Sequence, residues 1–249
     1  MRFRGQVAIV TGAATGIGRA TALAFGQEGA AVVLADVNDP AGRETERAVR
    51  EGGGAALYVT TDVAQAAHWT RLVDATLRQF GRVDVLFNNA GIGGGLAATA
   101  DYAEEAFDRV LAVNLKGVWL GMRAVIPPMI RQGGGVIVNN ASILGLVGFA
   151  EAPAYTAAKH GVIGLTRVAA LEYAAQGIRV NAVCPGFIRT PMVEREVPAE
   201  ALPTLTQLHP LGRLGEADEV ARLVLFLASS EATFITGAAY LIDGGYTAR

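Results

Sequence analysis

Residues 7–18 are Val7-Ala8-Ile9-Val10-Thr11-Gly12-Ala13-Ala14-Thr15-Gly16-Ile17-Gly18, and this stretch decides the fold. An apolar, β-branched run leads directly into a glycine-rich turn, and a helical pattern follows over residues 19–27. Glycine lets the backbone turn tightly and approach a pyrophosphate, while the start of the next helix offers unpaired N–H groups and a positive dipole end. A tight turn alone would also use glycine, but the strand–turn–helix context favours a phosphate site, although the spacing is G-x-x-x-G-x-G rather than G-x-G-x-x-G.

The alternation of short apolar runs and longer helical patterns continues to the end of the chain. Near-continuous hydrophobicity within the runs predicts strands covered on both faces, as in a parallel sheet between helices. Residues 64–80 and 154–176 show the apolar spacing of amphipathic helices. We therefore predict one doubly wound α/β domain over residues 1–249, with a seven-stranded parallel sheet flanked by helices. The predicted strands are residues 7–10, 31–35, 55–59, 83–87, 136–138, 178–183 and 239–242.

One segment, residues 187–215, breaks this rhythm. It contains Pro191, Pro198, Pro203 and Pro210 among charged and scattered apolar residues. A long irregular segment inside a compact domain is usually functional, so we predict a substrate loop with short helices here. A plain surface excursion is the alternative.

Composition excludes several classes of protein. With 51% hydrophobic residues, 18% charged residues and a net charge of −2, the chain lacks the basic excess of nucleic-acid-binding proteins. We find no run of about 18 apolar residues and no signal-peptide core, so we expect a cytoplasmic protein without a membrane partner. Cys184 lacks a partner for a disulfide within the chain and is expected to be a buried thiol, and His68, His160 and His209 are too scattered to predict a metal site.

The main chemical signature is Tyr155 followed four residues later by Lys159. Of the 21 basic residues only two are lysines, and one of them occupies this position. On a helix the two side chains share a face. A neighbouring ammonium favours the phenolate, so we expect it to lower the phenol pKa and to let Tyr155 exchange a proton with an alcohol oxygen. The alternative is that the two residues are simply neighbours on a helix.

Asp36 ends the second predicted strand, where a carboxylate can accept hydrogen bonds from the adenosine ribose hydroxyls. A 2′-phosphate there would bring like charges to about 4 Å, at a cost of roughly 4 kcal/mol per unit charge at an effective dielectric near 20. Neither Thr15 nor Val37 supplies a compensating cation. The sequence therefore predicts NAD(H) rather than NADP(H), unless Asp36 only caps the following loop.

In its ordered motifs the chain resembles the short-chain dehydrogenase/reductase family, from about Val7 to Gly245. After the glycine motif come Asp62-Val63, Asn88-Asn89-Ala90-Gly91, Asn114, Ser142, Tyr155-Thr156-Ala157-Ala158-Lys159, Asn181, Pro185-Gly186, Thr190 and Asp243-Gly244. The resemblance implies a Rossmann-type fold and hydride transfer at a nicotinamide. The chain departs from many relatives at Ala141 and Ala158, where serine is common; neither change removes a reacting group.

The resemblance also implies roles for particular residues. The catalytic set would be Asn114, Ser142, Tyr155 and Lys159: Tyr155 as acid/base, Lys159 lowering its pKa, Ser142 orienting the substrate oxygen and Asn114 holding a water in a proton relay. The implied cofactor contacts are Gly12, Thr15, Gly16, Ile17, Gly18, Asp36, Asp62, Val63, Asn88, Gly91, Tyr155, Lys159, Pro185, Gly186, Ile188 and Thr190.

The substrate pocket is expected to be largely apolar. By family position its lining would be Gly93, Gly94, Ile143, Leu144, Phe149, Glu151, Phe187, Met192 and Val193. An apolar pocket with one carboxylate fits a medium-sized secondary alcohol or ketone, cyclic or bearing a second hydroxyl near Glu151. Glu151 facing solvent is the alternative.

The sequence thus predicts an NAD(H)-dependent oxidoreductase that interconverts a secondary alcohol and a ketone. The alternatives are a 3-oxoacyl-[acyl-carrier-protein] reductase, which usually draws on NADPH, and a nucleotide-binding protein without turnover. The family resemblance further implies a homotetramer that packs through helices near residues 114–129 and 154–176.

Overall fold

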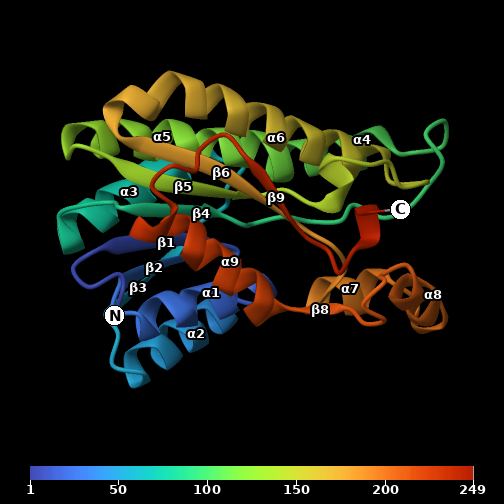
Figure 1. Cartoon of the computed structure of the whole chain (residues 1–249), viewed down its shortest axis with the longest axis horizontal. Helices are drawn as coiled ribbons and strands as arrows, with labels where there is room; N and C mark the ends of the chain where they lie inside the picture. The colour runs from blue at the N-terminus through green and yellow to red at the C-terminus, as the bar shows by residue number, and fades with distance from the viewer. Residues whose placement is uncertain (249) are drawn as a thin grey trace.

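A seven-stranded parallel sheet forms the centre of the computed structural model, which describes residues 1–248 (Figure 1). The strand order is β3-β2-β1-β4-β5-β6-β9, and every neighbouring pair is parallel. The predicted fold class and all seven predicted strands are confirmed. Their bounds are β1 Val7–Thr11, β2 Ala31–Asp36, β3 Ala56–Thr60, β4 Val85–Asn88, β5 Gly135–Asn140, β6 Ile178–Pro185 and β9 Ala239–Ile242.

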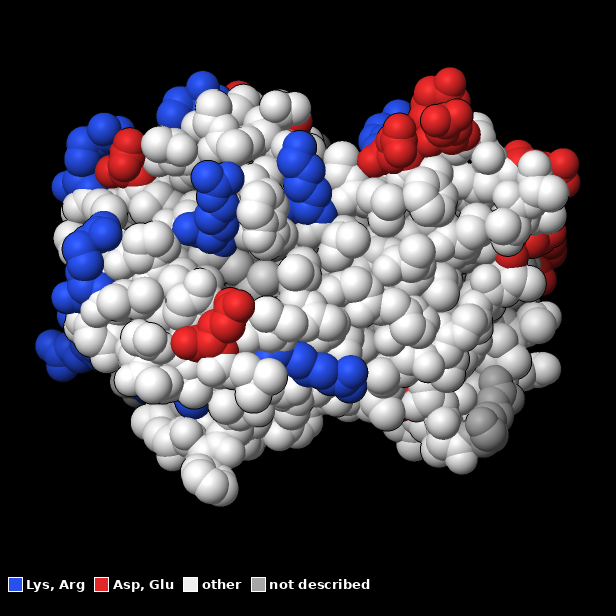
Figure 2. Space-filling model, turned by 90° about the horizontal axis from the view of Figure 1, so that it is seen from above, with Lys and Arg blue, Asp and Glu red and all other residues white. Residues whose placement is uncertain are grey.

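Helices cover both faces of this sheet. On one face lie α1 Gly16–Gln27, α2 Asp39–Glu51 and α9 Ala217–Ala228; on the other lie α3 Ala66–Phe80, α4 Glu104–Leu111, α5 Gly117–Arg131 and α6 Pro153–Tyr173 (Figure 1). Figure 2 shows the outer surface of the helix layer that contains α5 and α6. Basic side chains gather toward one end of this surface and acidic side chains toward the other, and a broad area of it carries no charge.

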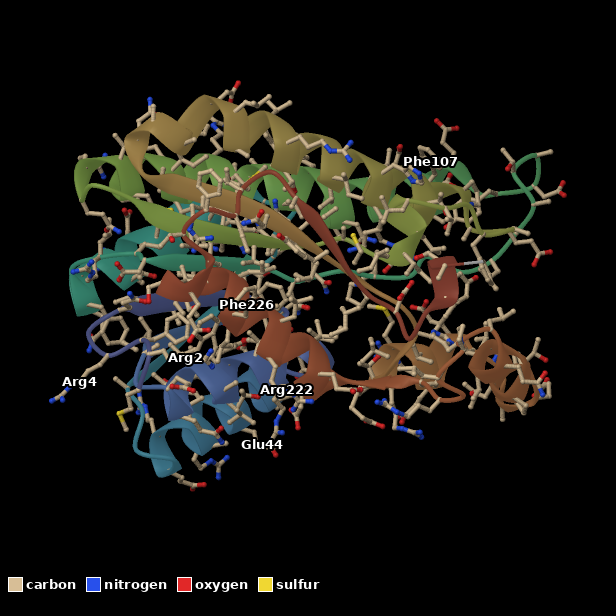
Figure 3. All side chains as sticks on the ribbon, viewed as in Figure 1. Arg2, Arg4, Glu44, Phe107, Arg222 and Phe226 are labelled. Atoms are coloured by element: carbon tan, nitrogen blue, oxygen red, sulfur yellow. The ribbon has the colours of Figure 1, made fainter. Side chains whose placement is uncertain are left out.

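Two apolar cores lie between the sheet and the helix layers. Successive strand residues alternate between them: Ile9 packs in one core with Trp69, and Val10 packs in the other with Phe25. Figure 3 shows side chains filling these layers, whereas Arg4 and Glu44 point outward. Burial on both faces explains why the strands are almost continuously hydrophobic.

The strand order reverses at β1, whose neighbours are β2 and β4. At such a switch point the connections leave toward opposite faces, and a crevice opens at the carboxyl ends of the strands. The turn after β1 and the loops after β4, β5 and β6 all leave from this edge.

The irregular segment 187–215 does contain short helices. They are α7 Pro191–Glu196 and α8 Leu202–Gln207, and a two-stranded parallel sheet of β7 Ile188–Arg189 and β8 Gly215–Glu216 brackets them. The Thr190 hydroxyl caps α7 by accepting from the Val193 N–H at 3.5 Å. The segment lies at one end of the molecule (Figure 1).

A π-helical turn, Ala112–Lys116, joins α4 to α5, so that residues 104–131 form one long helical stretch. By length and composition alone, Glu104–Arg131 is apolar enough to cross a membrane, with a mean hydropathy of 1.3 in its 18-residue window. The stretch includes polar residues such as Asn114, Lys116 and Arg123, so it is not an unbroken apolar run. Half of that window is buried inside the protein, as in a core helix.

Candidate active site

A cleft of about 480 Å³ lies at the carboxyl edge of the sheet. Its lining comes from the β1–α1 turn, the end of β2, the loops after β3, β4, β5 and β6, and the start of α6. Fourteen of the sixteen predicted cofactor residues line it: Gly12, Thr15, Gly16, Ile17, Asp36, Asp62, Val63, Gly91, Tyr155, Lys159, Pro185, Gly186, Ile188 and Thr190.

The glycine turn forms an open cradle at the start of α1. Gly12 and Gly16 have φ of +62° and +53°, and a Cβ at Gly12 would lie 2.9 Å from the Ala90 Cα. Thr15 makes no side-chain cap hydrogen bond, and the first turn of α1 carries no acidic residue. The positive end of the helix is therefore free to receive an anion, so these residues fit a dinucleotide's pyrophosphate.

Gly18 and Asn88 lie behind the cleft and do not line it. A Cβ at Gly18 would collide with the Gly12 carbonyl, so this glycine allows α1 to pack against the turn. The Asn88 amide donates to the Val118 carbonyl at 3.3 Å and to the Asn139 Oδ1 at 2.9 Å. Both residues therefore support the cleft from behind, and the prediction that they contact the cofactor does not match their positions.

Asp36 lines the opposite end of the cleft. Its Oδ2 accepts from the Ala14 N–H and its Oδ1 from the Asn38 N–H, both at 2.9 Å. These bonds hold the carboxylate beside the glycine turn. Each carboxylate oxygen keeps a further lone pair for a ribose hydroxyl.

Ser142, Tyr155 and Lys159 lie together in the cleft. Ser142 follows β5, and its Oγ accepts from the Leu144 N–H at 3.1 Å. Tyr155 is in the first turn of α6, with Lys159 one turn later. The Lys159 Nζ donates to the Asn140 carbonyl at 2.7 Å and lies 5.4 Å from the centroid of the Tyr155 ring.

The expectation that Lys159 lowers the Tyr155 pKa is not met in this structure. Burial raises the pKa of Tyr155 to about 12, opposed by a hydrogen bond with Ser142 and reinforced by the charge of Glu196. Burial also lowers the Lys159 pKa from 10.5 to about 8, because its side chain is only 3% exposed. Desolvation is therefore the largest cause of the pKa shift of each group.

Asn114 is fully buried on the π-helical turn, behind the cleft wall. Its Oδ1 accepts from the Ile92 N–H at 2.9 Å, and its Nδ2 donates to the Ile92 carbonyl at 2.7 Å. Both ends of the amide thus hold the loop after β4, in which Ile92 lines the cleft. The geometry gives this side chain a positioning role rather than a direct contact with a reacting group.

A second cavity, of about 250 Å³, opens beside the first and shares Ser142, Tyr155, Gly186, Met192 and Val193 with it. Most of its lining is apolar. Of the predicted substrate residues, it includes Gly93, Ile143, Leu144, Phe149, Phe187, Met192 and Val193.

Glu151 and Gly94 do not line this cavity. Glu151 has a left-handed backbone with φ +66°, and its side chain is exposed, so the predicted pocket carboxylate was the wrong residue. The Gly94 carbonyl instead accepts from the Tyr102 hydroxyl at 2.7 Å. The carboxylate that does line the cavity is Glu196, from the end of α7.

Other contributors were missed or undervalued by sequence reasoning. His209, which was considered from the sequence only as a metal ligand, is buried; its Nδ1 contacts the Leu205 carbonyl at 2.8 Å, and its Nε2 accepts from the Phe187 N–H at 3.2 Å. With the Nδ1 protonated, a neutral ring satisfies both contacts. Arg195, on α7, lines the first cleft. No periodic or motif signal marks these positions.

Cys184 is buried as predicted, and burial raises its thiol pKa to about 11. Within residues 1–248, no group of three or more His, Cys, Asp or Glu side chains could hold a metal ion.

Comparison with known proteins places this chain among nicotinamide-dependent enzymes. Residues 12–247 match the family model described as "Enoyl-(Acyl carrier protein) reductase". The chain is 43% identical to cyclohexanol dehydrogenase of Acinetobacter sp. (strain SE19), over 100% of this chain and 97% of the relative. It is 44% identical to 3-oxoacyl-[acyl-carrier-protein] reductase of Thermotoga maritima, over 98% and 99% of the two chains. The crystal structure of a levodione reductase superposes with a TM-score of 0.97 at 42% identity, covering 99% of each chain.

Proposed function

The chain belongs to the short-chain dehydrogenase/reductase family of oxidoreductases acting on CH–OH groups, and on that premise we propose that it is an NAD-dependent dehydrogenase of small cyclic secondary alcohols. One observation carries the proposal: Ser142 and Tyr155 line both the dinucleotide cleft and the apolar cavity. A substrate in the cavity therefore meets the acid/base pair at the border of the cleft.

The chain's own residues handle the proton. In reduction the Tyr155 hydroxyl gives its proton to the carbonyl oxygen as the carbonyl carbon gains a hydride, which leaves a phenolate; in oxidation the phenolate takes the hydroxyl proton as the carbinol carbon loses a hydride and the C=O bond forms. A bound nicotinamide supplies the hydride acceptor or donor. The Ser142 hydroxyl, whose oxygen is fixed by the Leu144 N–H, donates to the same substrate oxygen and stabilises its developing charge.

Lys159 and Asn114 complete the site without contacting the substrate carbon. Lys159 is anchored by the Asn140 carbonyl beside the Tyr155 ring and lines the dinucleotide cleft, where its ammonium can donate to a bound cofactor. Asn114 keeps the Ile92 loop in place, between the cleft and the cavity.

Asp36 supports NAD rather than NADP. Its carboxylate is fixed at the ribose end of the cleft by two backbone N–H groups. Among the described residues that line the cleft, the cations are Lys159, placed with Tyr155, and Arg195, on α7. A 2′-phosphate at Asp36 would meet an uncompensated like charge.

The cavity supports a compact apolar substrate. About 250 Å³ lined by aliphatic and aromatic side chains suits a single ring better than a long acyl chain. One relative, named cyclohexanol dehydrogenase, is named for a compound of this kind.

A 3-oxoacyl-[acyl-carrier-protein] reductase is the second candidate, because one relative at 44% identity carries that name. That name indicates a substrate carried on an acyl carrier protein. A cavity of about 250 Å³ leaves little room for a long acyl chain, so its volume favours the first candidate.

The apolar outer face of α5 and α6 supports a homo-oligomer. Trp119, Val168 and Leu171 are exposed there, and Gly164 presents bare backbone. We place the enzyme in the cytoplasm as a homotetramer that uses this face.

The test is NADH formation by the purified protein with cyclohexanol, with NADP in parallel. We expect turnover with NAD, and a loss of about 10²–10⁴-fold in kcat for Tyr155→Phe with NADH binding retained. Tyr173→Phe, at the far end of α6, is the matched control and should stay active. A preference for NADP would favour the second candidate, a 3-oxoacyl-[acyl-carrier-protein] reductase. NADH binding without turnover of any alcohol or ketone would indicate a nucleotide-binding protein without catalytic activity.

A further inference from the structure

Glu196 places a carboxylate at the wall of an otherwise apolar cavity. It ends α7, the first helix of the segment 187–215. Among the described residues that line the cavity, the ionisable side chains are Tyr155 and Glu196. Because Tyr155 belongs to the reacting end, Glu196 is the charged group left to contact the rest of a substrate.

The carboxylate is held only from one side. Its Oε1 accepts from the Gly93 N–H at 3.3 Å, a long bond, and its Oε2 makes no hydrogen bond within the described part of the chain. The side chain is exposed at the mouth, so a ligand that enters the cavity can reach it. One oxygen is therefore free to accept a hydrogen bond.

Gly93 makes this position possible. A Cβ on residue 93 would overlap both carboxylate oxygens of Glu196, so the carboxylate occupies the space that a side chain would fill. The two residues are 103 positions apart and come from the loop after β4 and the end of α7. A larger residue at position 93 would displace the carboxylate.

Tyr155 and Glu196 line the same cavity of about 250 Å³, a volume that suits a single ring. The charge of Glu196 also raises the pKa of Tyr155. A ring whose reacting hydroxyl meets Tyr155 therefore brings its distal substituent toward Glu196. A distal hydroxyl can donate to the free oxygen, whereas a distal carboxylate would be repelled.

We propose that Glu196 selects the substrate by its distal group, favouring cyclic alcohols with a second hydroxyl and rejecting those with a carboxylate. This inference rests on the proposed function, since it assumes that Tyr155 and Ser142 hold the reacting oxygen. It assigns Glu196 a direct contact with the substrate, with Gly93 setting the position of the carboxylate.

The experiment compares kcat/KM with NAD for three probes: cyclohexanol, cyclohexane-1,4-diol and 4-hydroxycyclohexanecarboxylate. In Glu196→Gln, the ratio of diol to cyclohexanol should fall about tenfold, and the ratio of hydroxy acid to cyclohexanol should rise by a similar factor. Glu194→Gln, an exposed change on the same helix, is the matched control and should shift neither ratio. Gly93→Ala should reproduce both shifts while the carboxylate remains chemically intact.

If the two ratios shift in opposite directions, Glu196 recognises the distal group of the substrate. A misplaced α7 would instead lower kcat/KM for all three probes together. Equal losses, or unchanged ratios in active variants, overturn the assignment. Absence of turnover in the wild type contradicts the proposed function instead. The same probes are therefore also titrated by thermal shift with NAD present, where loss of the diol's preferential stabilisation in Glu196→Gln supports the contact and its retention overturns it.

Discussion

At the scale of single residues, Lys159 combines a catalytic position with a cost to stability. Its pKa falls from 10.5 to about 8 on burial, so the folded protein holds this proton less tightly than the unfolded chain. At about 1.4 kcal/mol per pKa unit, the charged amine costs roughly 3 kcal/mol below pH 8. The cost declines between pH 8 and about 10.5, because the amine is then neutral in the folded state.

Replacing Lys159 by methionine should therefore abolish turnover yet raise stability at pH 7. After about 1–2 kcal/mol is subtracted for the lost bond to the Asn140 carbonyl, we expect Tm to rise by roughly 2–6 °C. The gain should shrink as pH increases from 8 to 10. Lys116→Met, at the exposed second lysine, is the control; a pH-independent difference or a lower Tm for Lys159→Met would contradict the argument.

The residue pairs that sequence predicts well are those that local geometry brings together. Tyr155 and Lys159 are one helical turn apart, so their proximity follows from the helix alone. Glu196 could not be found in this way, because its place opposite Gly93 depends on how α7 packs across a separation of 103 residues. Glu151 was a misleading candidate, since its left-handed backbone belongs to a turn whose side chain faces outward.

At the scale of elements, the π-helical turn Ala112–Lys116 brings Asn114 against the loop after β4. Asn114→Ala would leave the half-buried N–H and carbonyl of Ile92 without this amide, a cost of about 1–3 kcal/mol. We expect faster hydrogen exchange at the Ile92 amide and a higher KM for both cofactor and alcohol, because Ile92 lines the cleft and Gly93 the cavity.

Gln132 offers a matched control for this prediction. Its amide holds the backbone of Val83 in the same two-sided way, with Oε1 accepting from the N–H at 3.2 Å and Nε2 donating to the carbonyl at 2.6 Å. Val83 precedes β4 at the opposite edge of the sheet. Gln132→Ala should lower Tm comparably but leave KM unchanged; equal effects of both variants on KM would refute a positioning role for Asn114.

Elements with a strong periodic signal were predictable, and elements that depend on tertiary contacts were not. Near-continuous apolar runs predicted all seven strands because both faces of the sheet are buried. The two-residue strands β7 and β8 carry no period, and the π-helical turn interrupts an apolar helix without any breaker such as proline within it. Neither the short strands β7 and β8 nor the π-helical turn could therefore be predicted from the sequence pattern.

At the scale of the whole molecule, the outer face of α5 and α6 is more apolar than a monomer in water needs. Val168 is 52% exposed and Leu171 is 86% exposed, and Val168 lines a mainly apolar groove together with Trp119, Gly164 and Leu165. The surface seen in Figure 2 includes a broad uncharged area. Contiguous exposed apolar surface of this kind usually marks a protein interface. Gly164 lies on the same stripe of α6, and a Cβ there would meet no atom within 4 Å in the single chain.

Gly164 therefore distinguishes a surface needed for assembly from one needed for folding. Glutamate at this position improves helix propensity by up to about 1 kcal/mol and meets no neighbour within the chain, so the isolated subunit should keep its fold. Across an interface the same side chain would separate the two helices and bury a charge. We expect Gly164→Glu to shift the mass in light scattering toward the monomer, while Arg47→Glu on α2 leaves it unchanged. An unaltered oligomer in Gly164→Glu would show that the subunits meet elsewhere, because bare backbone at a closely packed helix crossing cannot accommodate a charged side chain of that size.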